Sequence, residues 1–485
     1  MKKILIIIIV CANMMSFSAC DDFLKEEPKS QLTNVGYYTT EAQAVANVNY
    51  LYRTGAIRQI ASAPSAYLGS FATVTGMLTG YFSNSYEGQE VVCKYSRELS
   101  RQKYTMQISG TVDGVWDACY NAINVANSAI KYIPSIPMED SSISKYVAEA
   151  KFFRAYTYNI LVNLFGGVPI VDKEELSPRF DYTRASRKEV LEFIQKDLEF
   201  AAQYLPIVTS DASQDGRIFR AAANHLLSEV YISLGQETGD QLFYDKSIAA
   251  ATAVIDGSCG EYALVKSRFG DTSRPGDYYS DLFWTNQQNR ASGNKEGIWV
   301  VQFEYLIPGA EEANNAQLRL WGPKIEDVTY PDGKKILVCD TVGRMQGIIR
   351  PLNHTNYEIW DDPNDIRYSP YNFKKEFYMN NPDSKYNGEK LVLTKKDDGK
   401  MYITLSDGTI TDKSVDTFRV CYPYFRKIEG EMPWGAMAGR TPNDRYIMRL
   451  SETYLLRAEA YFHKGDLANA ANDINVVRGR AQAKP

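Results

Sequence analysis

Apolar residues in the first half of the chain recur at steps of three and four, which is the spacing of the buried face of a helix. In the segment 113–133 they are Val115, Cys119, Ala122, Ile123, Ala126, Ile130 and Ile133. Pro134 then ends the pattern, because proline cannot continue a helix. A second helix is predicted for 144–165, where Gly166-Gly167 supplies a cap and Pro169 a stop. The two segments predict an antiparallel helical pair.

The same design returns in five further segments. Ser186 and Glu189 have the spacing of a capping box at the start of one of them. Gly465-Asp466 separates the last two, with glycine ending one helix and aspartate starting the next. The predicted helices cover 186–205, 220–234 before Gly235, 244–255, 452–464 and 467–480. The last pair is similar to a tetratricopeptide repeat, and unrelated helical hairpins are the alternative. The chain is therefore predicted to be mainly α, with a scaffold of stacked helical hairpins.

The helical pattern divides the chain into parts. Residues 41–257 are predicted to form the scaffold, interrupted at 67–104 by aromatic, glycine-bearing loops, and residues 447–485 to form a C-terminal hairpin. Between them, residues 258–446 are rich in turn dipeptides. Short strands are expected there at 298–303, 390–394 and 401–405. This loop-rich insert with short β-strands is the kind of region in which binding residues concentrate.

The first residues have the three-part layout of a signal peptide, predicted for 1–19. Two lysines precede an apolar core that is far shorter than the roughly 20 residues of a membrane-spanning helix. Phe17-Ser18-Ala19-Cys20 resembles a bacterial lipobox, which makes Cys20 the predicted lipidation site. The acidic segment that follows, within 20–40, is expected to be a flexible tether. An ordinary signal peptide with an incidental cysteine is the alternative.

Composition narrows the classes of function. The 485 residues are 44% hydrophobic, which is enough for a sizeable core, and the net charge of −5 gives no basic footprint for a nucleic acid. No two of the seven cysteines have metal-type spacing, and no essential disulfide is expected. Aromatic residues are abundant, with 34 Tyr and 20 Phe against 3 His. Such rings form either a large core or flat apolar faces for a ligand such as a sugar.

Segments spread along nearly the whole chain now resemble one family, the SusD/RagB-like outer-membrane lipoproteins of glycan-uptake systems. They include Cys20-Asp21-Asp22-Phe23-Leu24, Ala148-Glu149-Ala150-Lys151-Phe152-Phe153-Arg154-Ala155, Phe165-Gly166-Gly167-Val168-Pro169, Asp281-Leu282-Phe283 and Asn364-Asp365-Ile366-Arg367. The resemblance implies a tetratricopeptide-like scaffold with a loop-rich ligand-binding part. It also implies a lipid-anchored, surface-exposed protein that captures glycans and delivers them to a SusC-like TonB-dependent transporter. Family members usually continue past Pro485 with a helical tail, so the last hairpin is expected to fray.

The family's binding residues vary with the ligand, so the candidate residues rest on chemistry and position. Sugar binding needs flat rings for C–H faces and amides, carboxylates or guanidinium groups for hydroxyls. The early loops offer Tyr81, Phe82, Asn84 and Tyr86, and the insert offers Arg319, Trp321, Tyr330, Trp360 and Asp361. Core packing is the alternative for each ring, since large aromatics are highly buried on average. Trp116 and Trp299 are expected in the core, and Trp284 is expected to be structural.

Other functions have less support. Three scattered histidines suggest neither a catalytic triad nor a multi-histidine metal site, so no enzyme is predicted. A glycoside hydrolase stays as a remote alternative, because the separation of two carboxylates is not visible in a sequence. A surface scaffold that binds peptide or protein on its helical face is the stronger alternative. No cofactor is expected, but the acidic turn Asp361-Asp362-Pro363-Asn364-Asp365 could offer oxygen ligands to structural calcium.

Overall fold

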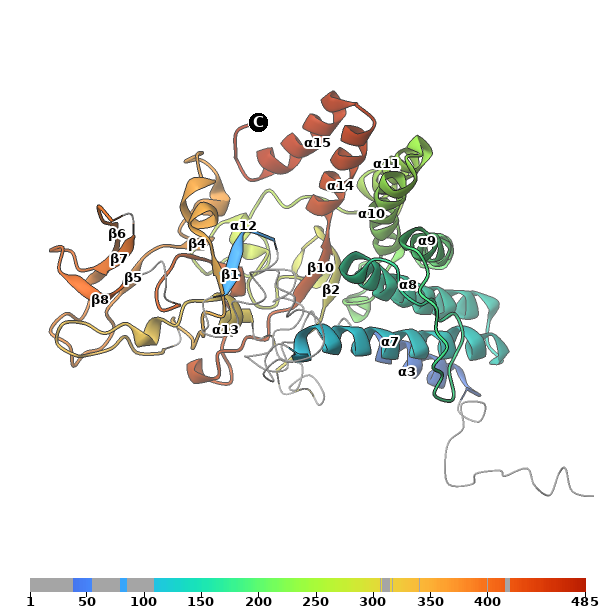
Figure 1. Cartoon of the computed structure of the whole chain (residues 1–485), viewed down its shortest axis with the longest axis horizontal. Helices are drawn as coiled ribbons and strands as arrows, with labels where there is room; N and C mark the ends of the chain where they lie inside the picture. The colour runs from blue at the N-terminus through green and yellow to red at the C-terminus, as the bar shows by residue number, and fades with distance from the viewer. Residues whose placement is uncertain are drawn as a thin grey trace, which may run out of the picture.

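The computed structural model describes residues 38–54, 79–84, 109–305, 307, 315, 317–339, 341–398, 400–414 and 419–485. Two parts lie side by side in Figure 1. Stacked helices form the right-hand part, and loops with short strands form the left-hand part.

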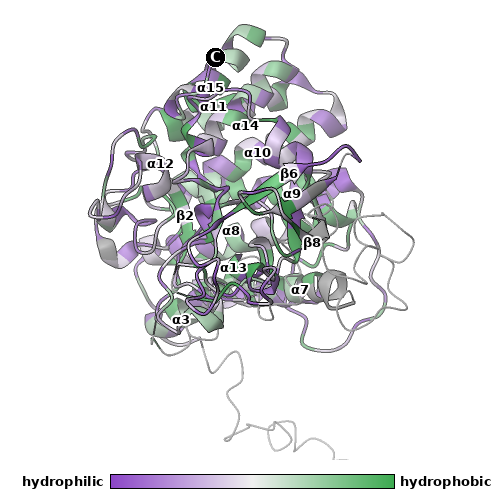
Figure 2. Ribbon diagram, turned by 90° about the vertical axis from the view of Figure 1, so that its left-hand side faces the viewer, coloured by the Kyte–Doolittle hydropathy of each residue, from purple (hydrophilic) through white to green (hydrophobic). Residues whose placement is uncertain are grey.

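The scaffold is built from eight long helices among the described residues. Most of them pack against the next one along the chain, and α11 packs against α14, which brings the C-terminal hairpin onto the stack. The helices are α3 (Glu41–Leu51), α7 (Ser109–Tyr132), α8 (Asp140–Phe165), α9 (Arg187–Tyr204), α10 (Arg220–Thr238), α11 (Gln241–Ile255), α14 (Leu450–His463) and α15 (Leu467–Arg480). Seven of them confirm predicted helices, whereas no periodicity had indicated α3 as a separate helix. Coloured by hydropathy in Figure 2, the scaffold helices carry both hydrophobic and hydrophilic residues, as amphipathic helices do.

Two helix ends have the capping contacts that the sequence predicts. The Ser186 side chain accepts a hydrogen bond from the Glu189 backbone N–H, while the Glu189 carboxylate accepts one from the Ser186 N–H at 2.7 Å, so the capping box is confirmed. Gly465 adopts a φ of 79° and Asp466 caps α15. These contacts satisfy backbone groups that a helix end would otherwise leave unpaired.

The predicted end of α10 at Gly235 is wrong. The helix continues to Thr238, and Gly239 ends it in the left-handed conformation with a φ of 73°. Gly235 serves packing instead, because a Cβ atom there would lie 2.7 Å from the ring of Tyr244 on α11. A glycine in a helix can therefore mark a close helix contact as well as an end.

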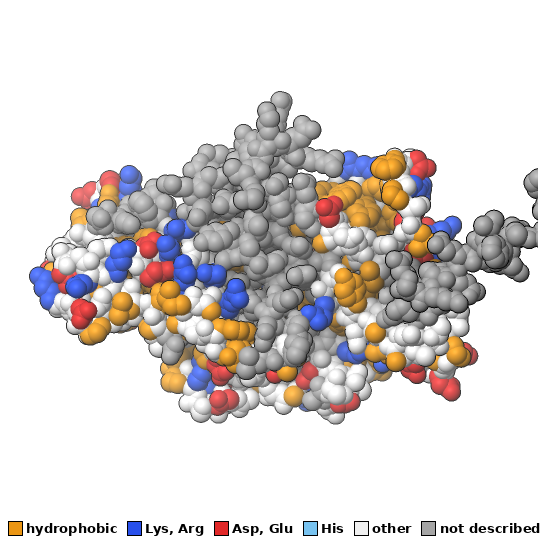
Figure 3. Space-filling view, turned by 90° about the horizontal axis from the view of Figure 1, so that it is seen from below, with side chains coloured by type: hydrophobic (Ala, Val, Ile, Leu, Met, Phe, Trp, Pro, Cys, Tyr) orange, Lys and Arg blue, Asp and Glu red, His pale blue; other side chains and the backbone are white. Residues whose placement is uncertain are grey.

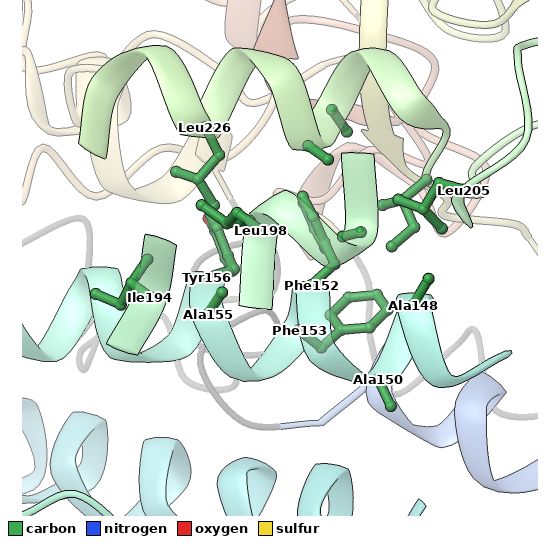
Figure 4. Packing of buried hydrophobic residues seen from close by; sticks show 14 of the residues in the cluster. Ala148, Ala150, Phe152, Phe153, Ala155, Tyr156, Ile194, Leu198, Leu205 and Leu226 are labelled. Atoms are coloured by element: carbon green, nitrogen blue, oxygen red, sulfur yellow. The ribbon is translucent and has the colours of Figure 1, made fainter. Parts of the chain in front are cut away.

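The main core lies between α8, α9 and α10, as the close-up in Figure 4 shows. Phe152 and Leu198 are fully buried there, and Ala148 and Ala155 keep the helices close. A buried ion pair crosses this core: the Arg154 guanidinium donates to both carboxylate oxygens of Asp197, at 2.6 and 2.8 Å. Because burying a charge is costly unless it is paired, these two residues hold α8 and α9 in one register.

Ten short strands lie in the described residues of the loop-rich half and of the segments that adjoin it. They form pairs β1–β3, β2–β10 and β4–β9 and one sheet with the order β5-β6-β7-β8. All pairings are antiparallel. The strands are β1 (Phe82–Asn84), β2 (Gly297–Val301), β3 (Ile349–Pro351), β4 (Phe373–Lys374), β5 (Phe377–Tyr378), β6 (Lys390–Lys395), β7 (Met401–Thr404), β8 (Ile410–Ser414), β9 (Tyr424–Phe425) and β10 (Arg445–Arg449). The three predicted strands are confirmed as β2, β6 and β7.

Short helical turns lie between the strands of this half, and two of them, at 133–135 and 212–214, lie between scaffold helices instead. They are α12 (Tyr278–Asp281), α13 (Gln317–Trp321), the π-helix η7 (His354–Glu358), and the 3-10 turns η2 (Ile133–Ser135), η3 (Ala212–Gln214), η4 (Arg290–Ser292), η6 (Ile325–Asp327), η8 (Ile366–Tyr368), η9 (Arg426–Ile428) and η10 (Ala436–Ala438). This half has a hydrophobic core of its own, which includes Leu318, Met345, Leu391 and Tyr424.

The β2–β10 pair joins the two halves. Trp299 on β2 is 1% exposed, and its ring contacts Phe152 and Tyr156 of α8 at 5.5 and 5.1 Å between centroids. The expectation that Trp299 is a core residue is therefore confirmed, while Trp116 is half-buried and packs against the edge of the same core. Because β10 runs directly into α14, the junction also positions the C-terminal hairpin.

The last turn of α15 is anchored, contrary to the expected fraying. The Arg480 guanidinium pairs with Glu296, and both side chains are at most 2% exposed. Ala481 and Ala483 are buried, and the Lys484 backbone N–H donates to Asp362 of the loop-rich half at 2.6 Å. These contacts exist because the chain after α15 turns back onto the loop-rich half. None of the described helices has the length and apolar character of a membrane span.

Candidate functional site

Several predicted site residues lie around the β1–β3 pair. Phe82 on β1 pairs with Pro351 of β3, and its ring meets the edge of the Trp321 ring with centroids 5.0 Å apart. Trp321 lies on α13, where its indole N–H donates to the Gln317 side chain at 2.7 Å. Both rings are half-buried, so each is fixed on one side and reachable on the other. A ring held in this way loses little entropy when a ligand binds to it.

Tyr81 and Trp360 are connected through one residue. Thr355 on η7 donates its hydroxyl to the Tyr81 carbonyl at 2.8 Å, and its own carbonyl accepts from the Trp360 indole N–H at 3.0 Å. Tyr81 is 53% exposed, which leaves its ring open to solvent. Tyr81 and Trp360, which are almost 280 positions apart in the sequence, are thereby brought onto one surface.

The Trp360 ring is partly occupied by its neighbours. It stacks on Tyr368 with centroids 4.7 Å apart and planes at 10°, and it also contacts Phe425 of β9. Asp361 beside it is exposed. Trp360 therefore supports an aromatic cluster and has one flat face covered by another ring.

The other predicted site residues that the structure describes are more buried or are engaged within the fold. Tyr330 is 2% exposed and packs in the second core beside Tyr386, so it is a core residue and offers no face to a ligand. Arg319 is half-buried on α13, and Asn84 pairs through its backbone with Ile349. Tyr86 and Cys20 lie outside the described residues.

The structure adds an aromatic pair that sequence reasoning missed. The rings of Tyr305 and Trp434 meet edge to face with centroids 4.9 Å apart, and Tyr305 is 37% exposed. The loop that carries Trp434 returns to α13, because a Cβ atom at Gly439 would lie 2.8 Å from the Cγ atom of Arg319. Both residues stand in irregular segments without periodicity, so only their aromatic character could have drawn attention to them.

A pocket was also missed. About 330 Å³ of empty space, open to solvent, lies between α12, β4 and β9. Trp284, which was expected to be structural, lines it, and the Arg274 guanidinium lies 3.6 Å above the centroid of its ring. Tyr371 at the pocket is 44% exposed, whereas the Asn372 amide is buried and donates to the Asp277 carboxylate at 2.9 and 3.0 Å. Flat rings next to guanidinium groups suit sugar recognition.

The pocket is lined by more cationic than anionic side chains. Three cationic side chains line it, Arg274, Arg426 and Lys427, against the single carboxylate of Glu429. That carboxylate is already bound, since it accepts from Arg426 Nε at 2.8 Å and from the Tyr424 hydroxyl at 2.7 Å. Figure 3 shows further Lys and Arg side chains gathered over the left-hand, loop-rich part of the molecule when it is seen from below.

A buried tyrosine next to the pocket responds to this charge. Burial by itself raises the pKa of the Tyr279 phenol, but the nearby charges of Lys427, Arg449 and Arg480 outweigh burial and lower the pKa to about 8. An opposite charge favours the ionised form of a group, so the shift indicates positive potential at this position.

The described residues offer little for catalysis or metal binding. His225 is buried and bonded to the Thr453 hydroxyl at 2.8 Å, and His354 lies on the surface beside Glu358. No group of three or more His, Cys, Asp or Glu side chains in the described ranges could hold a metal ion. In the acidic turn, Asp362 accepts the Lys484 N–H and Asp365 pairs with Arg367. Cysteines 119, 259, 339 and 421 are free thiols.

Two sequence models of one family match the chain. The model described as starch-binding and associating with the outer membrane matches residues 22–232, and the model described as the SusD family matches residues 353–485. The chain belongs to the SusD/RagB-like family.

Individual SusD-like relatives agree with this assignment. SusD-like protein P38 of Formosa agariphila is 25% identical over 313 residues, which are 64% of this chain and 55% of that protein, so the match spans about half of its length. A SusD superfamily structure from Parabacteroides distasonis has a TM-score of 0.64 at 19% identity, with 92% of this chain and 81% of the other covered. A laminarin-binding SusD-like protein has the same TM-score and identity, with 92% and 85% covered. The mainly α, tetratricopeptide-like fold of the family is thus the fold of this chain.

Proposed function

We propose that this protein captures oligosaccharides or polysaccharides at the cell surface and passes them, uncleaved, to a SusC-like TonB-dependent transporter in the outer membrane. Family membership supports this function, because the matching family model is described as starch-binding and associating with the outer membrane. Lipid on Cys20 would tether the protein to that membrane.

The observation that carries the proposal is the arrangement of the rings. Phe82 and Trp321 form one edge-to-face pair, and Tyr305 and Trp434 form another, on loops and short elements that converge at α13. Each pair is only half-buried or exposed at its rim. We call these four residues the aromatic platform. Amphipathic rings that are fixed by their neighbours and open on one side suit the apolar C–H faces of sugars.

Affinity electrophoresis of the protein in gels that contain neutral and acidic polysaccharides tests this function. Wild-type protein should be retarded by at least one glycan, and Trp434→Ala or Trp321→Ala should weaken that retardation. Phe462→Ala is a matched control, because Phe462 is a 61% exposed ring on α14 of the scaffold, away from the platform.

Two results would contradict the proposal. Retardation that is lost equally in Phe462→Ala would place binding on the helical scaffold, as expected of a peptide- or protein-binding surface. Release of reducing sugar from a retained glycan would show cleavage and revive the hydrolase alternative.

A further inference from the structure

We propose that the pocket between α12, β4 and β9 binds an acidic sugar unit, one that carries a carboxylate or a sulfate group. This inference rests on the proposed glycan capture and names the chemical class of the ligand. The aromatic platform uses separate residues, so the pocket is a second contact point for the same kind of ligand.

The first argument is that two cations at the pocket have no carboxylate partner. Arg426 is neutralised by Glu429, whereas no carboxylate of the described chain forms an ion pair with Arg274 or Lys427. The Arg274 Nε atom is buried without a hydrogen-bond partner. That atom is itself covered, but the guanidinium charge that it shares has no carboxylate partner in the described chain and would be stabilised by a ligand anion in the pocket.

The second argument is that both cations are held in place by aromatic rings. Arg274 lies over Trp284, and the Lys427 ammonium lies 4.7 Å from the centroid of the Phe283 ring and 5.4 Å from that of Tyr279. Arg268 fixes the backbone of the Arg274 loop by donating to the carbonyls of Arg274 and Gly276. The cationic groups are therefore positioned before a ligand arrives, which lowers the entropic cost of binding.

The third argument is the geometry with which a guanidinium and an ammonium group bind an anion. A guanidinium group matches a carboxylate or sulfate through two parallel hydrogen bonds, while an ammonium acts as a point charge. The exposed Tyr371 ring at the pocket would meet the sugar ring that carries the acid. The pocket is small and open to solvent, so it would receive the charged group of one sugar unit rather than enclose a whole sugar ring.

Paired polysaccharides that differ only in charge test the inference. We would compare polygalacturonate with its methyl ester, and dextran sulfate with dextran, by affinity electrophoresis and titration calorimetry at low and high salt. The carboxylate pair and the sulfate pair distinguish the two sources of negative charge. Wild-type protein should bind at least one charged member more tightly than its neutral partner, and the preference should shrink as salt screens the charges.

Two single variants assign the preference to the pocket. Arg274→Gln and Lys427→Gln should each weaken binding of the charged glycan about tenfold or more, because each removes a charge-assisted contact. Lys188→Gln is the matched control, since Lys188 is an exposed cation on α9 that pairs with Glu192. Unchanged thermal unfolding shows that the variants are folded, and Lys427→Gln keeps the test valid if Arg274→Gln is unstable.

The outcomes separate this inference from the proposed function. Equal binding of charged and neutral partners, or a charge preference that survives in both pocket variants, overturns the acidic-sugar site and leaves glycan capture intact. Absence of binding to every glycan, charged or neutral, overturns glycan capture and the pocket assignment with it. Loss of the charged glycan alone in the two pocket variants supports the inference.

Discussion

The two halves of the molecule differ in which segments their exposed rings contact: Tyr204 of the scaffold contacts Phe200 of the same helix, whereas Tyr305 of the loop-rich half contacts Trp434 of a distant segment. In the scaffold core the rings are enclosed, as with Phe152 and Tyr158, which are both 0% exposed. In the loop-rich half, Tyr330 and Tyr422 are equally buried, but Tyr81, Tyr305 and Tyr371 have between 37% and 53% of their surface exposed. Tyr50 and Tyr204 of the scaffold are exposed as well, at 56% and 40%, so the abundance of tyrosine reflects core packing and exposed rings in both halves.

The pairing of charged side chains also differs between the scaffold and the pocket. In the scaffold, Arg154 and Asp197 satisfy each other across α8 and α9, and Arg457 pairs with Asp473 across the last hairpin. At the pocket of the loop-rich half, Arg274 and Lys427 lack such a partner within the described chain. Complete pairing stabilises a fold, whereas cations that keep free donors are available to a ligand.

The largest effect is expected in the scaffold core. Phe152→Ala should lower the free energy of unfolding by about 3–5 kcal/mol, because it leaves a cavity where the ring contacted Trp299. Tyr371→Ala in the loop-rich half should change it by less than about 0.5 kcal/mol, since the ring is 44% exposed. Urea denaturation followed by circular dichroism measures both. Equal losses in the two variants would erase the distinction between enclosed and open rings.

A smaller effect is expected at a close helix contact. Gly235→Ala should cost about 1–3 kcal/mol, because the new methyl group would overlap the Tyr244 ring of α11. Gly408→Asn is the counterpart in the loop-rich half: its φ is 83° and open space surrounds the position, so asparagine should be tolerated. Thermal unfolding of the two variants would sharpen the comparison, and a neutral Gly235→Ala would show that α10 and α11 can move apart freely.

A further effect concerns pH at the junction of the halves. Desolvation raises the pKa of the half-buried Asp444 to about 7, although its carboxylate accepts from the Phe303 N–H and the Asn289 amide. Between about pH 4 and 7 the folded state holds a proton that the unfolded state has lost, so stability should fall as pH rises through this window. Asp444→Asn should flatten that fall in denaturation curves at pH 4, 5.5 and 7. An unchanged slope would exclude Asp444 as its source.

Local pattern predicted the scaffold well and the site poorly. Helix periodicity and capping depend on neighbours within a few residues, and this is why Ser186, Glu189 and Gly465 were interpreted correctly. Gly235 was misassigned because its meaning depends on Tyr244 of another helix. The same applies to the pocket: Arg274, Tyr371 and Lys427 come from segments about 50 to 150 positions apart, and only the fold brings them together.

The candidate rings show that residue type alone does not predict which rings are exposed. Phe82 and Trp321 do meet, but Tyr330, which also stands beside turn residues in the sequence, is buried in the second core. Exposure of a ring is set by packing between distant segments, which a single sequence does not display. Family resemblance supplied the fold and left the binding residues open, because those vary with the ligand.

Hydrogen exchange with and without a retained glycan tests the central claim most directly, because it reports both halves in one experiment. Glycan binding should slow exchange in the peptides that contain α13, the Tyr305 segment and the Trp434 loop. Exchange in α8, α9, α10 and α11 should stay unchanged. Protection confined to the scaffold helices, with none around Trp321 and Trp434, would contradict a loop-rich binding half carried by a structural scaffold.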